Sequence, residues 1–140
     1  MHKRRAILED LKAQLKNLPG YGGVWIQRSA PNRNAFPAIT LFSESENIDT
    51  LTIHGAPRPQ QRTLQVSVMV WIQSVQDEEK TEINFDKAAI DIEQKLTRPA
   101  GVDDMILLGT EFSFVEDDME INAVTLIYKI SYITIEYNPI

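Results

Sequence analysis

The chain has no cysteine and only two histidines, His2 and His54, among its 140 residues. Without cysteine there is no disulfide, no thiolate metal site and no cysteine nucleophile. Two separated histidines do not supply the clustered ligands of a tetrahedral zinc site. His54 lies beside Gly55 in a polar stretch, and no nucleophile-elbow motif offers a serine for it to activate. We therefore expect a protein without catalytic residues, bound metal or cofactor.

Long apolar runs and phosphate-binding motifs are missing as well. No stretch approaches the roughly 20 apolar residues of a membrane span. The basic N-terminus is like the start of a signal peptide, but Glu9, Asp10 and Lys12 interrupt the apolar segment that export requires. The glycine patterns that cradle nucleotide phosphates do not occur. These absences favour a cytosolic product that binds neither a membrane nor a nucleotide.

Acidic residues outnumber basic ones, and the formal net charge is −6. The field of the whole molecule therefore repels nucleic-acid phosphates. The positive charge is uneven, with one group at residues 2–5 and another at Arg58 and Arg62. These cations are either solvated side chains or part of an interaction surface, and the sequence leaves both interpretations open.

The apolar content is that of an ordinary globular protein, at 43% of the residues. A chain of this length is of the usual size for one domain and can bury a complete core. We therefore interpret residues 1–140 as a single domain.

Two segments show the periodicity of amphipathic helices. The first is predicted over about 3–17 and ends before Pro19 and Gly20. The second is predicted over about 78–96 and ends before Pro99. Their buried sides are expected to carry Ile7, Leu8, Leu11, Leu15 and Leu18 in the first helix and Phe85, Ala89, Ile92 and Leu96 in the second.

Strict alternation of apolar and polar residues predicts two long strands, over 62–73 and about 121–137. Shorter strands are expected at 24–26, at 36–42 and over 105–115, the last either bent or divided in two. Continuous apolar runs of the parallel type are few. The pattern is typical of an α+β fold with a mainly antiparallel or mixed sheet and both helices on one face.

Residues 43–61 are polar and contain Gly55, Pro57 and Pro59. They form either a long loop or an extended hairpin arm. Structureless loops longer than about 12–15 residues are uncommon in compact domains and usually bind something or move. This segment is therefore the first functional pointer in the chain.

The second face of the predicted sheet carries Met69 and Trp71 from one strand and Ile127, Ile133 and Ile135 from another. Tyr137 continues this set. An apolar sheet face without a covering helix often marks an interaction surface. The alternative is that loops of the same chain fold over it.

Two acidic segments could offer oxygen ligands to Mg²⁺ or Ca²⁺. Asp103 and Asp104 form the first; the second contains Glu116, Asp117, Asp118 and Glu120. The spacing lacks the ligand pattern of a calcium-binding loop. A solvated acidic turn is the simpler interpretation, and a carboxylate-dependent metal enzyme is the less favoured alternative.

The order of these patterns resembles the tail terminator family of long-tailed bacteriophages, related to the minor tail protein U of siphophages. The resemblance covers nearly the full chain. It includes the N-terminal helix, the strand beginning Phe36-Pro37-Ala38, the polar segment, the alternating strand over 64–72, the acidic helix with Ile90-Asp91-Ile92-Glu93, and the closing Tyr128-Lys129-Ile130-Ser131-Tyr132. None of these motifs is catalytic.

The resemblance implies a structural virion protein located at the junction of tail and neck after assembly in the host cytoplasm. Its partners would be further copies of itself in a homohexameric ring, the major tail tube protein, and a head-completion or connector protein. Such a ring ends polymerisation of the tube and offers a head-joining surface, while DNA passes through its lumen without specific binding. Another neck or tail-completion protein, docking on the portal side, is the alternative within the virion.

The family has no residue signature that transfers to single positions, so the interface residues are inferred from the pattern alone. We predict subunit or tail-tube contacts at Met69 and Trp71 on the second sheet face. We also predict them at His54, Arg58 and Arg62 in or beside the polar segment.

Overall fold

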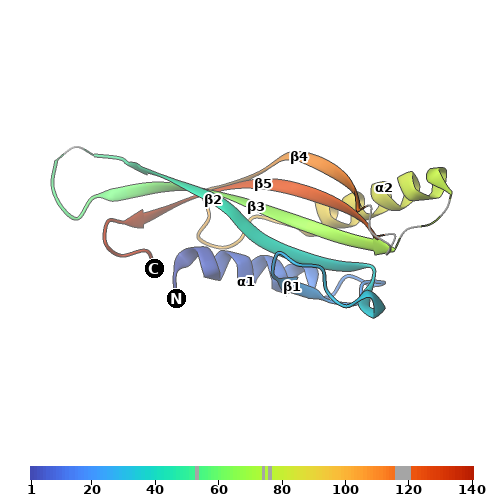
Figure 1. Ribbon diagram of the computed structural model, residues 1–140. Coiled ribbons are helices and arrows are strands. Elements are labelled where there is room, and N and C mark those ends of the chain that lie inside the picture. The colour runs from blue at the N-terminus through green and yellow to red at the C-terminus, as the bar shows by residue number, and fades with distance from the viewer. Residues whose placement is uncertain (53, 74, 76, 116–120) are drawn as a thin grey trace.

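The computed structural model describes all residues except 53, 74, 76 and 116–120. The elements follow in the order α1 (Lys3–Leu15), β1 (Val24–Ile26), η1 (Arg33–Ala35), β2 (Ala38–Thr50), β3 (Pro59–Gln73), α2 (Glu78–Lys95), β4 (Asp104–Val115) and β5 (Ile121–Ile135). The five strands form one twisted sheet in the order β1-β2-β3-β5-β4 (Figure 1). Only the β1–β2 pair is parallel among the described strands.

Both helices pack on the same face of the sheet and share one core with it. That face is formed by the alternate residues of β3 and β5 that pair across the ladder, such as Val68 with Leu126. Because successive strand residues point to opposite faces, the alternation seen in the sequence becomes a continuous apolar layer. The α+β class, the mainly antiparallel sheet and the placement of both helices on one face are confirmed.

Helix α1 begins at Lys3 as predicted, where the His2 side chain caps it by accepting a hydrogen bond from the Arg4 amide. It ends at Leu15, two residues before the predicted end, so Leu18 packs against the core from outside the helix. Helix α2 is capped by Asp77, and its buried side carries Ala88, whereas Ala89 is half-buried. The difference arises because Phe85, Ala88 and Ile92 follow the 3- and 4-residue steps of one stripe more closely.

The segment predicted as a bent or divided strand is one strand, β4. Its register against β5 shifts between Leu107 and Gly109, so Leu108 is an extra residue opposite the partner strand. Such a bulge bends a strand without ending it. The closing strand ends at Ile135, two residues before the predicted end.

Most of segment 43–61 is a hairpin arm that continues β2 and β3 (Figure 1, left). Pairing runs out to Thr50 opposite Gln60, and β5 accompanies β3 as far as Pro59. The distal part of the sheet is therefore a three-stranded projection. It reaches beyond α1, and the two termini lie together beneath it, joined by a 2.8 Å hydrogen bond from the Lys3 amide to the Pro139 carbonyl.

Candidate interaction site

A buried network of charged and polar groups lies at the root of the arm. Arg62 on β3 donates to Glu46 on β2 at 2.7 Å and to the Thr134 hydroxyl on β5 at 2.8 Å. The Tyr132 hydroxyl donates to the other oxygen of Glu46. The side chains of Arg62 and Glu46 are only 11% and 7% exposed. All three strands of the arm are therefore joined through one carboxylate and one guanidinium.

The start of α1 is part of the same network. Arg4 approaches Glu46 at 3.4 Å, and His2 Nε2 lies 3.5 Å from the Arg62 guanidinium. Partial burial, followed by the charges of Arg4 and Arg62, lowers the pKa of His2. Burial and the Glu46 hydrogen bond raise the pKa of Tyr132. Near neutral pH, His2 is therefore a neutral cap and Tyr132 a neutral donor.

A buried ion pair of this kind contributes little net stability, because desolvation of the two charges offsets their attraction. Removing either partner, however, is strongly destabilising, because the other charge is then buried without a partner. Arg62 and Glu46 are therefore held together in this one arrangement. The network therefore holds the direction of the arm relative to α1 more than it raises the stability of the fold.

A second ion pair lies further out on the arm. Arg58 donates to both oxygens of Glu136, at 2.6 and 3.2 Å, and its carbonyl accepts from the Glu136 amide. The Arg58 hydrogen bonds lower the pKa of the Glu136 carboxyl. Exposed apolar side chains surround this region: Ile48, Leu51, Ile133, Ile135 and Tyr137. The distal arm therefore combines a fixed geometry with an apolar surface.

The second sheet face is less open than the sequence pattern implied. Trp71 is only 8% exposed, and its indole N–H donates to the Thr40 hydroxyl at 2.8 Å. Met69 is half-buried on the same face. Trp71 therefore offers little surface to a partner, while Met69 offers part of its side chain.

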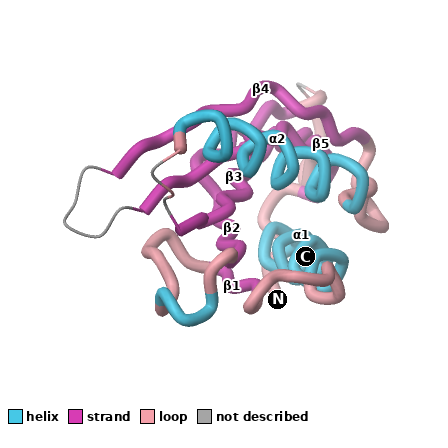
Figure 2. The backbone as a smooth tube through the Cα atoms, turned by 90° about the vertical axis from the view of Figure 1, so that its right-hand side faces the viewer, coloured by secondary structure: helices cyan, strands magenta, loops and turns pink. Residues whose placement is uncertain are grey.

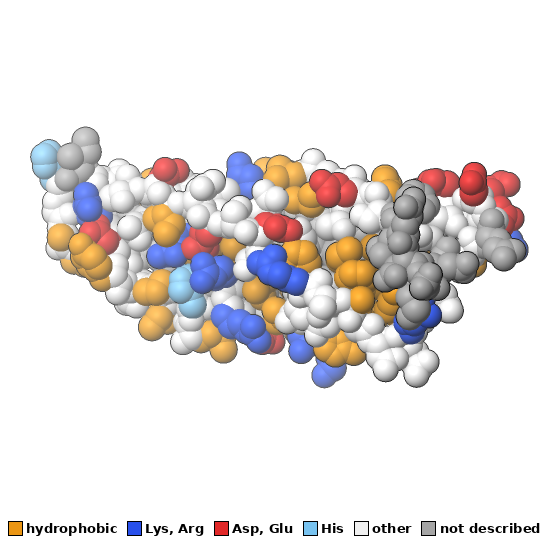
Figure 3. Space-filling model, in the orientation of Figure 1, with side chains coloured by type: hydrophobic (Ala, Val, Ile, Leu, Met, Phe, Trp, Pro, Cys, Tyr) orange, Lys and Arg blue, Asp and Glu red, His pale blue; other side chains and the backbone are white. Residues whose placement is uncertain are grey.

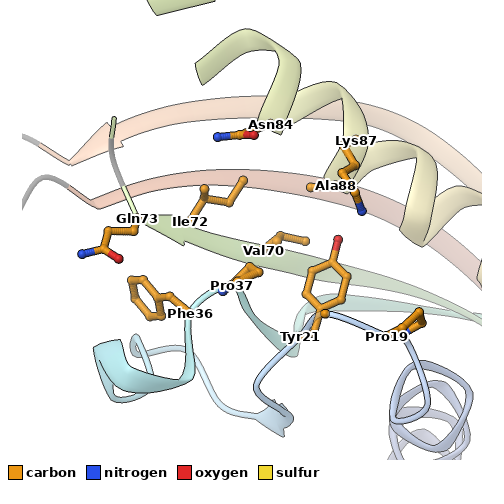
Figure 4. Close-up of a pocket in the computed structure, with 11 residues that line it drawn as sticks. Pro19, Tyr21, Phe36, Pro37, Val70, Ile72, Gln73, Asn84, Lys87 and Ala88 are labelled. Carbon is orange, nitrogen blue, oxygen red and sulfur yellow. The ribbon is translucent and has the colours of Figure 1, made fainter. Parts of the chain in front are cut away.

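A cavity of about 360 Å³ lies at the opposite end of the molecule, between α2 and the loops before β1 and β2 (Figure 4). Its wall is mainly apolar, formed by residues such as Phe36, Pro37 and Ile72. At its rim the Tyr21 hydroxyl donates to Asp91 at 2.7 Å, and Lys87 donates to the same oxygen at 2.7 Å. Burial and the Asp91 contact raise the pKa of Tyr21. This triad ties the loop after α1 to α2.

The structure does not gather the five predicted interface residues into one patch. Arg58 and Arg62 lie four residues apart along the arm, each with its own carboxylate partner. His54 is exposed at the arm tip, far along the chain from Met69 and Trp71. The partners Glu46 and Glu136 were missed by sequence reasoning. An acidic residue opposite Leu64 on the core side of a strand pair was the available signal, but only the strand register reveals it.

Only some of the carboxylates considered as metal ligands belong to the described residues. Asp103 and Asp104 are exposed at the start of β4, and residues 116–120 lie outside the described residues. Across the described part of the chain, no group of three His, Cys, Asp or Glu side chains is arranged to hold a metal ion. Over the same residues, no helix is long and apolar enough to cross a lipid bilayer.

Comparison with known proteins finds no matching family model and no matching curated protein. Among solved structures, the chain is similar to one from the virion of a native gene transfer agent (GTA) particle, with 13% sequence identity and a TM-score of 0.48. The match covers 95% of this chain and 92% of that one. A likeness this distant carries no argument about function.

Proposed function

We propose that this chain is a structural protein of a phage virion that works by assembly and not by catalysis. Copies of it form a ring on the end of the tail tube, stop polymerisation of the tube and offer a surface to the head-joining protein. The order of the sequence patterns resembles that of the tail terminator family. The observation in the structure that supports the proposal best is the braced arm.

The arm is built for contact with another molecule. The arm is a three-stranded extension of the sheet, and a narrow sheet depends on a packed face or on side-chain contacts for its stability in water. Here Arg62, Glu46 and Tyr132 hold the root, and Arg58 with Glu136 holds the outer part. The rigid arm presents exposed apolar residues such as Ile48 and Leu51 to the solvent. Pre-organised apolar surface lowers the entropic cost of binding, which suits a contact with a preformed tube.

The charge of the molecule is compatible with a DNA channel. A net charge of −6 repels phosphates, so a ring of such subunits would let DNA pass without retaining it.

The test is assembly, measured with and without tail tubes. Light scattering of the purified chain is expected to detect a species six times 15.9 kDa, alone or after addition of tubes made of the major tail tube protein of the same phage. Electron microscopy is then expected to find one ring at a tube end. A chain that stays monomeric and does not bind tubes would overturn the proposal. A ring that binds isolated portal or connector instead of the tube would assign it to the head side of the neck.

The arm tip is tested by the double variant Ile48→Thr/Leu51→Ser, which removes exposed apolar surface while leaving the root network intact. We expect tube binding to weaken by at least about tenfold, because each lost apolar side chain contributes on the order of 1 kcal/mol. Val75→Thr is the matched control, since Val75 is also exposed but lies at the other end of β3.

A further inference from the structure

The charges of this chain are sorted to opposite edges of the sheet. Residues 1–42 contain seven Lys or Arg and two Asp or Glu, whereas residues 77–115 contain ten Asp or Glu and four Lys or Arg. The first segment forms α1, β1 and the start of β2; the second forms α2 and β4, the strand at the far edge. Figure 2 shows α1 beside β1 and β2, and α2 over β4 and β5. Figure 3 shows basic side chains over α1 and acidic ones concentrated over α2.

The edge formed by β4 and α2, here called the acidic edge, exposes apolar side chains on both faces of β4. Ile106, Leu108 and Phe112 are 44%, 55% and 52% exposed. Ile106 pairs with Lys129 on the face away from the helices, whereas Phe112 pairs with the core residue Val124. Phe112 also packs on Phe85 of α2, with ring centroids 5.3 Å apart. Exposed carboxylates accompany these side chains on both faces. Asp104 and Glu111 share the face of Ile106, and Glu82 and Glu93 lie on the same side of α2 as Phe85. Apolar side chains bordered by charged ones are common at protein–protein interfaces.

The edge formed by α1, β1 and the loop that follows β1, here called the basic edge, is its counterpart. On α1, Gln14 bonds to Thr97 on the side toward α2, so the stripe of Arg5, Lys12 and Lys16 lies on the side away from α2. In the loop after β1, Arg28 stacks on the Phe42 ring at 4.8 Å and is 64% exposed at its side chain. The basic edge therefore presents cations from both α1 and the loop after β1.

We propose that the acidic edge of one copy docks on the basic edge of the next, so that the partner of each edge is a second copy of this chain. This inference rests on the proposed ring and names the surfaces that form it. Two acidic edges repel each other, so the contact joins unlike patches. A contact between unlike patches is heterologous, and when its rotation closes it generates a ring. The charge complementarity also steers neighbouring copies into register.

Reversal of charge on each edge tests the proposal. The first variant is Glu82→Lys/Glu111→Lys, which places two lysines on the acidic edge and brings the net charge of residues 77–115 from −6 to −2. The second is Lys12→Glu/Lys16→Glu, which places two carboxylates on the basic edge and brings the net charge of residues 1–42 from +5 to +1. Each alone is expected to raise the concentration needed for assembly by at least about tenfold, because like charges then meet. An equimolar mixture of the two is expected to restore the ring with alternating subunits, as is the chain carrying all four substitutions.

The mixture separates a lost interface from a damaged fold, since a misfolded variant would not recover on mixing. Circular dichroism of each variant supplies an independent control. If both variants assemble at the same concentration as the natural chain, the edge assignment is wrong while the proposed ring stands. If each fails alone and the mixture also fails, the assignment is overturned. A natural chain that never assembles, even with tubes, removes both proposals.

Discussion

Glu46 is the residue on which the arm root depends. Its two carboxylate oxygens receive Arg62, Arg4 and Tyr132 from three different elements. The Glu46 side chain is 7% exposed, so these donors replace the water that would otherwise hydrate its carboxylate. Such a group is costly to neutralise, because its cationic partner would remain buried without a counter-charge.

We predict that Glu46→Gln lowers the free energy of unfolding by about 3 kcal/mol, as is usual when one partner of a buried pair is removed. Glu44→Gln is the matched control, because Glu44 is more exposed and lies 4.0 Å from Arg28. That change is expected to cost less than about 1 kcal/mol. Urea unfolding of the three proteins measures both values. Equal losses would mean that the network does not act as a buried unit.

His2 makes the same region sensitive to pH. Its Nδ1 accepts the Arg4 amide, so the ring must be neutral, and burial with the nearby cations holds its pKa below the ordinary 6.5. The unfolded chain therefore binds the proton first, and stability contributed by neutral His2 is complete above pH 6.5 and falls as the pH drops below it.

We predict a decrease in the urea midpoint between pH 7 and pH 5.5 that is smaller in His2→Asn. Asparagine keeps a capping oxygen but does not titrate. An identical decrease in both proteins would assign the effect to other groups.

At the scale of elements, β1 is the most constrained piece. It has three residues, and just before it the Gly22 amide donates to the carbonyl of Pro37, the residue that precedes β2, at 2.9 Å. A Cβ on Gly22 would lie 1.9 Å from the Ala35 carbonyl oxygen, so only glycine fits here. The loop therefore fixes where β1 adds to the sheet.

We predict that Gly22→Ala costs about 1–3 kcal/mol, because a backbone neighbour has to move. Gly109→Ala is the control, since a Cβ there meets no atom within 4 Å. That variant is expected to be neutral or slightly more stable, because alanine restricts the unfolded chain. Thermal unfolding of the two variants gives the comparison. If Gly22→Ala left the stability unchanged, the backbone at Gly22 and Ala35 would be able to move apart without cost.

Local periodicity was sufficient to predict both helices and the two longest strands. Every second residue of a strand faces the core, and in a helix the core-facing residues recur with a period of 3.6. It could not decide between loop and arm for segment 43–61, because polar residues such as Ser45 and Asn47 are extended only through pairing with β3. It also missed the arm root. Tyr132 and Glu46 are 86 positions apart, and their contact depends on the register of three strands.

For the whole molecule, the separated charges make assembly a matter of ionic strength. The two edges attract through water at their rims, where the Debye length falls from about 10 Å at 0.1 M salt to about 3 Å at 1 M. Contacts made by the exposed apolar side chains of Ile106, Leu108 and Phe112 are not screened in this way.

We therefore predict that the ring dissociates partly when NaCl is raised from 0.1 to 1 M, at constant protein concentration. Light scattering across a salt titration measures the loss. The four-substitution chain, in which two charges on each edge are exchanged for the opposite sign, is expected to dissociate with salt in the same direction. A ring that tightens with salt would indicate an interface dominated by apolar contact.

The hydrogen bond between Lys3 and Pro139 has a practical consequence for the assembly. Because both ends of a subunit leave it at one point, a peptide joining the end of one copy to the start of the next has to span the repeat distance between neighbours. A fully extended linker covers at most about 3.5 Å per residue. In a series of covalent tandem dimers, the shortest linker that still permits a closed ring would thus act as a molecular ruler for the spacing of its subunits.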